Sequence, residues 1–351
     1  MRLDVELKKS FKDFTLDVEF SLSSPRMGVF GPSGSGKSTI MNLLSGLELP
    51  DSGYIRLGTT VLFDSKEKIN LKPDQRNVGV VFQHAHLFPH MSVKRNIFYG
   101  FKRVKPENRK IDPAGLFEVL GVTQLLSRDV STLSGGERQR IALARTVLSN
   151  PRLILMDEPL SALDEGHKFQ IIPYLKNVFN SYGIPMIFIS HSVLEMRMMT
   201  DEVLVIERGQ IQQHGSAEEL VKKSWNRGLE SYINLLNLGC TSSYKGLFRC
   251  EWGDTNIILT EPAEGGDNLF ELDSRDILLF KRHPEATSAR NLLECTVTDI
   301  YSSGNRVRVE LACGTEHLIA QIVPESVHEL GIKEGTMVVA AIKASAFKKI
   351  F

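Results

Sequence analysis

The nine residues GPSGSGKST, at positions 31–39, combine three glycines and four hydroxyl side chains with one lysine. Glycines let backbone N–H groups turn toward an anion, and the start of a following helix adds partial positive charge. Lys37 suits contact with the β- and γ-phosphates of a nucleotide, and the Ser38 hydroxyl suits Mg²⁺. We therefore predict a phosphate-binding loop formed by Gly31, Pro32, Ser33, Gly34, Ser35, Gly36, Lys37, Ser38 and Thr39.

Three further polar residues follow apolar runs that indicate buried strands. Asp157 and Glu158 follow the run LILM, and His191 follows the run PMIFIS. Because the C-terminal ends of parallel strands meet at one edge of a sheet, we expect all three near the phosphates. There Asp157 would help to hold Mg²⁺, Glu158 would activate the attacking water, and His191 would bind a γ-phosphate oxygen.

The elements that position these residues can also be predicted. The run MGVF (27–30) indicates a strand leading into the loop, and KSTIMNLLSGL (37–47) has the apolar spacing of a helix. In LSGGERQR, Ser134 suits the cap of a helix whose first turn contains Gly135 and Gly136. Two glycines destabilise a first turn and expose its N–H groups, so we expect a close approach there. These patterns predict nucleotide binding and leave kinases, GTPases, motors and transport ATPases as alternatives.

LSGGERQR resembles the signature of ATP-binding-cassette ATPases, and over residues 1–230 the motifs follow that family's order. The resemblance implies that Gln83 in VGVVFQ senses Mg²⁺ and contacts a membrane partner, and that Asp164 in SALD faces a second subunit. It also implies an aromatic ring stacked on adenine. We assign that ring to Phe11, with Phe14 as the alternative, although the family usually has tyrosine there.

The same resemblance implies a homodimer that binds two ATP molecules head to tail. Ser134 and the amides of Gly135 and Gly136 would complete the γ-phosphate site of the other chain. A helical subdomain at about residues 84–135 would dock on two transmembrane permease subunits, which places the chain at the cytoplasmic face of the bacterial inner membrane. A periplasmic binding protein would deliver the solute.

Composition narrows the classes of function. The 351 residues contain 42 basic and 42 acidic side chains without a basic arm, so no nucleic-acid partner is expected. No apolar run approaches the ~20 residues of a membrane helix, which predicts membrane association through a partner. His84, His86 and His90 lack the spacing of zinc ligands and are expected at the surface of the docking subdomain. Four cysteines without a C-x-x-C pair predict reduced thiols.

The chain changes in composition after the cassette. SAEELVKK (216–223) and LESYINLLNL (229–238) indicate short helices, and short β-prone runs between Gly, Pro, Asn and Asp follow. Such runs predict small barrels of the oligonucleotide-binding type. We therefore predict an α/β P-loop NTPase cassette with a mixed sheet and a helical subdomain over 1–230, a linker and β segment over 231–286, and a small all-β barrel domain over 287–351.

The last of these regions carries its own resemblance. TSARNLLECTVTDIY and the closing IKAS resemble the molybdate-binding (Mop/TOBE) module of molybdate carriers, regulators and the ATPase of the molybdate importer. The resemblance implies an ATP hydrolase that energises molybdate import, and an oxyanion site whose donors come from Ser288, Arg290, Asn291, Lys343 and Ser345. In the alternative interpretation, SARN only opens a strand and the barrel binds no oxyanion.

Three other functions compete with molybdate import. An importer ATPase for sulfate, tungstate, ferric iron, a polyamine or a sugar would share the cassette and differ in the tail. A soluble cassette that remodels DNA or ribosomes typically has a coiled coil or a second cassette, whereas this chain has one P-loop and one LSGGE. A protein that only stores or senses oxyanions would not need the hydrolytic residues between Lys37 and His191.

Overall fold

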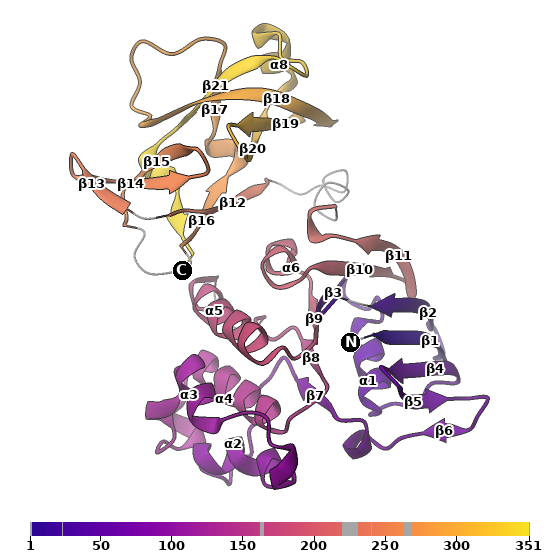
Figure 1. Cartoon of the computed structure of the whole chain (residues 1–351). Helices are drawn as coiled ribbons and strands as arrows, with labels where there is room; N and C mark the ends of the chain where they lie inside the picture. The colour runs from indigo at the N-terminus through magenta and orange to yellow at the C-terminus, as the bar shows by residue number, and fades with distance from the viewer. Residues whose placement is uncertain are drawn as a thin grey trace. The chain divides into compact units, whose positions relative to one another are not determined.

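The computed structural model describes residues 2–22, 24–161, 165–219, 231–239, 241–262 and 268–350. The chain forms two compact units, Met1–Lys222 and Lys223–Phe351 (Figure 1). The first unit contains the predicted phosphate-binding loop, and the second consists mainly of strands.

The described residues of the first unit form two sheets. A six-stranded, mostly parallel sheet has the order β11 (Gln210–Gly215), β10 (Glu202–Glu207), β3 (Arg26–Phe30), β9 (Met186–Ser190), β8 (Leu153–Asp157) and β7 (Val78–Val81). An antiparallel sheet has the order β2 (Thr15–Leu22), β1 (Leu3–Ser10), β4 (Ser52–Leu57), β5 (Thr60–Asp64) and β6 (Ile69–Asn70). Only β11 runs antiparallel to its neighbour in the first of these sheets. The predicted mixed α/β architecture is confirmed.

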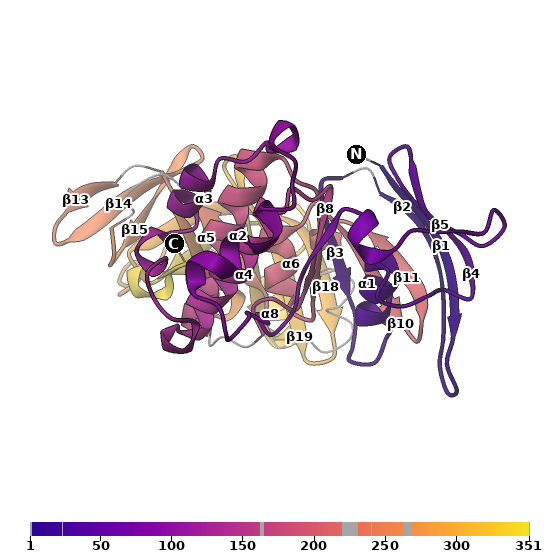
Figure 2. The ribbon, with the colours of Figure 1, turned by 90° about the horizontal axis from the view of Figure 1, so that it is seen from below.

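Helix α1 (Lys37–Ser45) lies between the two sheets (Figures 1 and 2). Its side chains Ile40, Leu43 and Leu44 join one hydrophobic core with residues of both sheets. Strands β8 and β9 are buried almost throughout, as expected for central parallel strands covered on both faces. In β2, by contrast, buried and exposed residues alternate. This shared core fixes the position of α1, whose first turn begins where the glycine loop ends.

The remaining helices of the first unit form two groups. Helices α2 (Val93–Phe101), α3 (Pro113–Val119) and α4 (Gly135–Leu148) gather away from the antiparallel sheet (Figure 2). Helix α2 packs on α4, so the helical group continues beyond the expected limit near residue 135. Helices α5 (Glu165–Tyr182) and α6 (Val193–Met199) follow β8 and β9, and α6 packs on β3 and β9.

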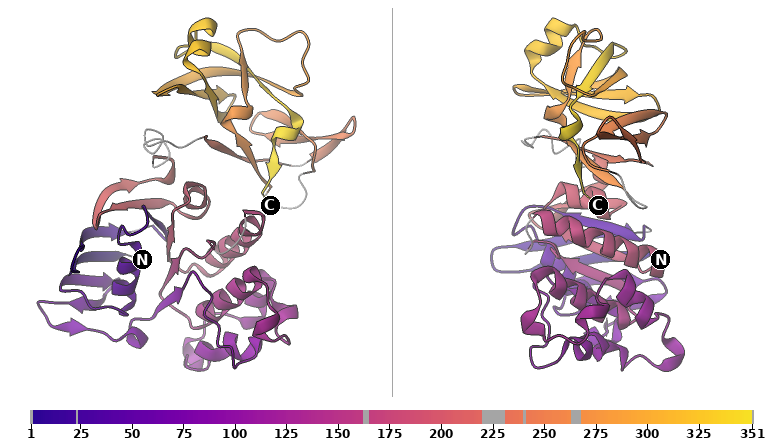
Figure 3. Two further views of the ribbon diagram at one scale, coloured as in Figure 1. Left: turned by 180° about the vertical axis from the view of Figure 1, so that it is seen from behind. Right: turned by 90° about the vertical axis from the view of Figure 1, so that its left-hand side faces the viewer.

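The described residues of the second unit form strands and the short helix α8 (Pro324–Leu330) (Figure 3). Its sheets are β17–β21–β18–β19–β20, β13–β14–β15 and β12–β16–β22. The strands are β12 (Ile233–Asn237), β13 (Thr241–Tyr244), β14 (Leu247–Trp252), β15 (Thr255–Leu259), β16 (Leu269–Asp273), β17 (Leu278–Phe280), β18 (Asn291–Ser303), β19 (Arg306–Cys313), β20 (Glu316–Ile322), β21 (Met337–Ile342) and β22 (Lys348–Lys349). One hydrophobic core, including Trp252 and Phe270, joins the strands before residue 286 to those after it.

Two expectations for the second unit were wrong. The helix predicted from LESYINLLNL is strand β12, whose apolar residues alternate and whose backbone pairs with β16. The four cysteines are not all reduced, because Cys295 and Cys313 form a disulfide between the neighbouring strands β18 and β19. Antiparallel pairing places these two residues opposite each other, which their separation of 18 positions does not reveal. Cys250 is buried, and Cys240 lies outside the described residues.

Candidate functional site

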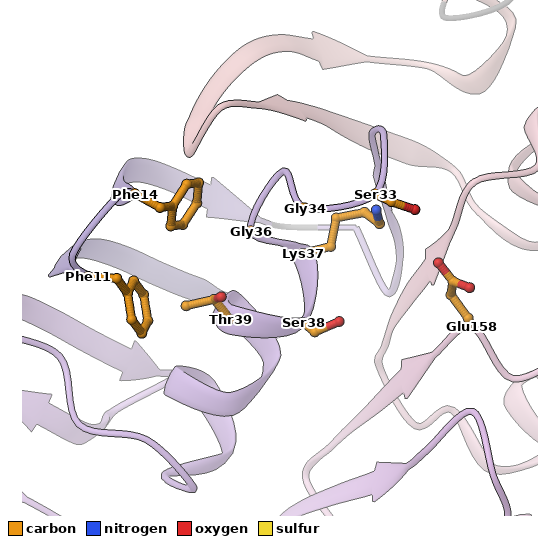
Figure 4. A pocket seen from close by; sticks show the side chains of 9 residues that line it. All are labelled: Phe11, Phe14, Ser33, Gly34, Gly36, Lys37, Ser38, Thr39 and Glu158. Carbon is orange, nitrogen blue, oxygen red and sulfur yellow. The ribbon is translucent and has the colours of Figure 1, made fainter.

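A cavity of about 350 Å³ opens at the glycine loop (Figure 4). The two aromatic rings lie on one side of the loop and Glu158 lies on the other. The lining residues are Phe11, Phe14, Ser33, Gly34, Gly36, Lys37, Ser38, Thr39 and Glu158. The cavity therefore combines an apolar aromatic side, a backbone loop with a lysine, and a carboxylate.

The conformation of the loop depends on its glycines. Gly34 and Gly36 have φ values of 77° and 106°, in the left-handed region that favours glycine. A Cβ atom on Gly36 would lie 2.9 Å from the ring of Phe14, and one on Gly31 would lie closer still to the backbone oxygen of Ile206. The loop is thus closely packed between β10 and the aromatic residues, with its N–H groups leading into helix α1.

Lys37 is the buried cation of this loop. Its Nζ donates hydrogen bonds of 2.9 Å to the backbone oxygens of Gly31 and Pro32. Burial lowers the pKa of Lys37, while the negative charges of Glu158 and Asp157 act in the opposite direction. The ammonium group is therefore fixed beside the loop and faces two carboxylates from the end of β8.

A second cavity, of about 600 Å³, adjoins the other side of the loop. Its lining residues are Asp13, Phe14, Thr15, Pro32, Ser33, Gly34, Ser35, Glu207 and Arg208. Eight of the nine predicted loop residues line one of these two cavities. The ninth, Gly31, accepts a hydrogen bond from Lys37 Nζ through its backbone oxygen.

The strand ends bring together the four side chains predicted to meet at the phosphates. Ser38 Oγ lies 3.4 Å from Asp157 Oδ1, and His191 Nδ1 lies 3.4 Å from Glu158 Oε1. Burial raises the pKa of Asp157, and the neighbouring charge of Glu158 adds to this effect. Glu158 has a φ of 42°, a strained value for this residue type that carries its side chain to the cavity. Two carboxylates, a histidine and a hydroxyl thus lie near the C-terminal ends of β8 and β9.

A buried network behind His191 escaped the sequence analysis. The carboxylate of Glu195 accepts hydrogen bonds from Ser190 Oγ at 2.5 Å and from Lys168 Nζ at 3.1 Å. Ser190 Oγ in turn accepts a bond of 3.0 Å from the backbone N–H of Ser192. Glu195 therefore ties both neighbours of His191 to helix α5, where Lys168 lies. An isolated glutamate in VLEMRMM gave no signal of this contact in the sequence.

Comparison with known proteins identifies the family. A family model described as ABC transporter matches residues 15–161, and a model described as TOBE domain matches residues 287–348. A relative from Mannheimia succiniciproducens, named a molybdenum import ATP-binding protein, is 37% identical over 98% of this chain and 99% of the relative. The chain belongs to the ABC transporter family.

Two further similarities agree with this assignment. A relative from Shewanella with the same name is 34% identical over 97% of this chain and 96% of its own length. The solved structure of cbiO1 from Clostridium perfringens, described as part of an ABC transporter complex, has a TM-score of 0.55 and 26% identity over 64% of this chain and 92% of that one. The chain is thus an ATPase of the ABC type, which binds ATP and couples its hydrolysis to transport. No helix among its described residues is long and apolar enough to cross a membrane.

The residues assigned to adenine both lie at the cavity of the ABC ATPase. Phe11 and Phe14 line it with ring centroids 6.0 Å apart. Phe11 is 41% exposed, whereas Phe14 packs against the hydrophobic core of the first unit. An exposed ring is freer to receive a planar ligand, which favours Phe11 without removing Phe14 from the cavity.

The segment that contains Gln83 does not line the cavity. Gln83 is exposed just after β7 and is not among the residues that line it. His84, His86 and His90 follow in the same exposed segment, and no group of three or more His, Cys, Asp or Glu side chains in the described part of the chain is arranged to hold a metal. Asp164 lies outside the described residues.

The LSGGE segment begins helix α4 as predicted. Ser134 Oγ accepts the N–H of Glu137, and the carboxylate of Glu137 accepts the N–H of Ser134 at 2.7 Å. A Cβ atom on Gly136 would lie 3.1 Å from Ile171 of helix α5, so one close approach at this glycine pair comes from the same chain. Ser134 and Gly135 are exposed, and neither lines the cavity at the glycine loop.

The residues expected to bind an oxyanion differ in their surroundings. Ser288, Lys343 and Ser345 are exposed. Arg290 lines a separate cavity of the second unit. Asn291 is 2% exposed, and its amide bonds to the backbone N–H and C=O of Ile258 at 2.6 and 3.0 Å. The side chain of Asn291 therefore holds two strands together in this structure.

Proposed function

We propose that this chain is the ATP-hydrolysing subunit of a molybdate importer. The observation that carries the proposal is the similarity over 98% of the chain to a relative named a molybdenum import ATP-binding protein. The similarity includes the second unit, where a TOBE domain model also matches. The cavity at the glycine loop supports the proposal, because its lining includes a lysine, hydroxyl groups and a carboxylate suited to phosphoryl transfer.

In the proposed mechanism the glycine loop holds the β- and γ-phosphates. Backbone N–H groups at the start of α1 and the ammonium of Lys37 offset the negative charge of the phosphates. Glu158 accepts a proton from the attacking water, and His191, whose ring lies 3.4 Å from that carboxylate, orients the water and a γ-phosphate oxygen. Glu195 acts through His191 by fixing the turn on which it lies.

Mg²⁺ fits the oxygen groups beside the loop. Ser38 Oγ and Asp157 Oδ1 lie within 3.4 Å of each other, and Mg²⁺ prefers hydroxyl, carboxylate and phosphate oxygens. We assign Ser38 as the direct ligand and Asp157 as the carboxylate beside it, with Gln83 approaching from the end of β7. The ion would neutralise charge on the β- and γ-phosphates.

Two chains would form the complete site. Within one chain the cavity is lined by the glycine loop, the aromatic pair and Glu158. Ser134 and Gly135 are exposed and do not line this cavity. Head-to-tail pairing would bring Ser134 and the amides of Gly135 and Gly136 to the γ-phosphate of the partner chain, with Asp164 near the contact. Closure on ATP would then be the step that drives transport.

The remaining partners follow from this proposal. Two transmembrane permease subunits would bind the helical group and the exposed segment of Gln83, which places the chain at the cytoplasmic face of the inner membrane. A periplasmic binding protein would deliver molybdate to the permease. In the second unit the candidates for oxyanion contact are Ser288, Arg290, Lys343 and Ser345. Asn291 would support them indirectly, because its side chain hydrogen-bonds to the backbone of a neighbouring strand.

Reconstitution tests the cargo. The chain and its permease subunits are placed in vesicles, and ATP hydrolysis is measured with binding proteins loaded with molybdate, tungstate, sulfate or ferric iron. We expect the molybdate-loaded protein to give the largest stimulation. Stimulation by another loaded protein and none by molybdate would assign the chain to an importer of that other solute.

A further inference from the structure

One face of the sheet β13–β14–β15 is directed away from the core of the second unit. Cys250, Trp252 and Ile257 on the inner face are buried in that core. Because side chains alternate along a strand, Arg249 and its cross-strand partner Ile258 lie on the outer face. This outer face forms one wall of a cavity of about 700 Å³, lined by Tyr244, Lys245, Leu247, Arg249, Asn256, Ile258, Ala289 and Arg290.

The cavity has an excess of positive charge. Lys245, Arg249 and Arg290 contribute three cations, and none of its lining residues has a carboxylate. Within the described part of the chain, none of these three cations forms an ion pair, although basic residues elsewhere in the unit do, such as Arg275 with Asp273. The chain as a whole has no net charge, so this local excess is not a consequence of composition.

Neighbouring residues place all three cations at the cavity. The Arg249 guanidinium carbon lies 4.4 Å from the centroid of the Tyr244 ring, and Lys245 Nζ lies 5.5 Å from it. The buried amide of Asn291, next to Arg290, bonds to both backbone groups of Ile258 in β15. These two hydrogen bonds keep Arg290 beside the outer face of the three-stranded sheet. Glu251, the next residue on that face of β14, lies against Gly239 and does not line the cavity.

We propose that this cavity binds an organic phosphate, a small molecule with one or more phosphoryl groups on an apolar or aromatic body. Arginine and lysine without acidic partners are suited to phosphoryl oxygens. One phosphoryl group carries about two negative charges, so three cations match a ligand with more than one such group better than a single free oxyanion. Leu247, Ile258 and Ala289 supply an apolar surface for the rest of the molecule.

The size of the cavity supports the same ligand class. A volume of about 700 Å³ lies within the range of sites for small organic molecules and far exceeds the space of one tetrahedral ion. The proposal does not depend on the transported solute. The cavity also lies entirely within the second unit, apart from the ATP site, so the two functions can fail separately.

Binding to the full-length chain tests the proposal. The Lys37→Ala variant is used throughout to weaken phosphate binding at the glycine loop. Isothermal titration calorimetry is performed with fructose 1,6-bisphosphate, adenosine diphosphate and pyridoxal phosphate, and separately with inorganic phosphate and molybdate. We expect at least one organic phosphate to bind more tightly than both inorganic ions, and its affinity to fall as salt is added.

Substitutions then locate the site. Combining Lys245→Ala with Arg249→Ala should weaken that binding about tenfold or more, because it removes two of the three cations at the cavity. Arg282→Ala, which removes an exposed cation outside the cavity, should leave the affinity unchanged, and thermal unfolding of each variant checks its fold. Binding that survives the double substitution in a folded chain, or no binding by any organic phosphate, would overturn the proposal. Tight binding of molybdate alone would reassign the cavity to a free oxyanion.

Discussion

The cavity at the glycine loop and the basic cavity of the second unit differ in how their charges are arranged. In the first, Lys37 is buried, its ammonium bonds to loop carbonyls, and carboxylates from β8 lie close by. In the second, three cations lie on exposed side chains without a carboxylate in the lining. The first arrangement holds opposite charges at fixed positions, as catalysis of phosphoryl transfer requires, whereas the second is suited to binding alone.

Removing the proposed base from the cavity at the glycine loop should have the largest effect, and that effect is on ATP hydrolysis. Glu158→Gln keeps the shape of the side chain and removes its ability to accept a proton, so we expect kcat for ATP hydrolysis to fall by about 10²- to 10⁴-fold. Binding of ATP, measured by a fluorescent analogue, should be retained. Glu67→Gln, at an exposed position outside the cavity, is the matched control. Turnover close to that of the unmodified chain would show that another group activates the water.

Removing the disulfide should affect only the second unit. Changing Cys295 and Cys313 together to alanine releases a constraint on the unfolded chain, and we expect the free energy of unfolding of that unit to fall by about 2–4 kcal/mol. ATP hydrolysis by the first unit should not change. Calorimetric unfolding with and without a reducing agent gives the measurement, and an unchanged transition of the second unit would contradict the expectation.

The network behind His191 should have a smaller effect on catalysis. Glu195→Ala removes the acceptor of both Ser190 and Lys168, and we expect kcat to fall roughly tenfold through misplacement of His191, with little change in KM for ATP. Lys168→Met removes only one of these contacts and should have a smaller effect. Glu195→Gln keeps an acceptor for Ser190 and should restore part of the rate. A loss of thermal stability with an unchanged kcat would limit Glu195 to a structural role.

The smallest effect concerns acid stability of the first unit. Ser21 and Arg2, through hydrogen bonds, lower the pKa of Asp4 from 3.8 to about 2, with a further bond from Arg56. A depressed pKa stabilises the fold above the unfolded value, and this contribution is lost as pH falls from about 4 toward 2. Asp4→Asn should therefore lower stability at neutral pH and make stability less dependent on pH below 4. Urea unfolding at pH 7 and pH 3 tests this, and an equal loss at both values would contradict it.

The residues of the ATP site could be predicted from the sequence, because each lies next to a recognisable strand or helix. The glycine loop lies between a strand and a helix, and Glu158 and His191 follow buried strands, so connectivity alone brings them to one sheet edge. The basic cavity could not be predicted in this way, because Arg249 and Arg290 come from segments 41 positions apart that are joined by tertiary contacts such as the hydrogen bonds between Asn291 and Ile258. The helix predicted over residues 229–238 was wrong, because a short apolar run fits both the helical and the strand periodicity. Pairing with β16 stabilises the strand conformation of its residues 233–237.

In the proposed mechanism, two copies of the chain bind ATP between them. The most direct measurement is the molar mass of the Glu158→Gln variant by light scattering, with and without saturating ATP and Mg²⁺. Because this variant should bind ATP without hydrolysing it, we predict a monomer in the absence of nucleotide and a stable dimer in its presence. A variant that binds ATP and remains a monomer would show that ATP does not join two chains.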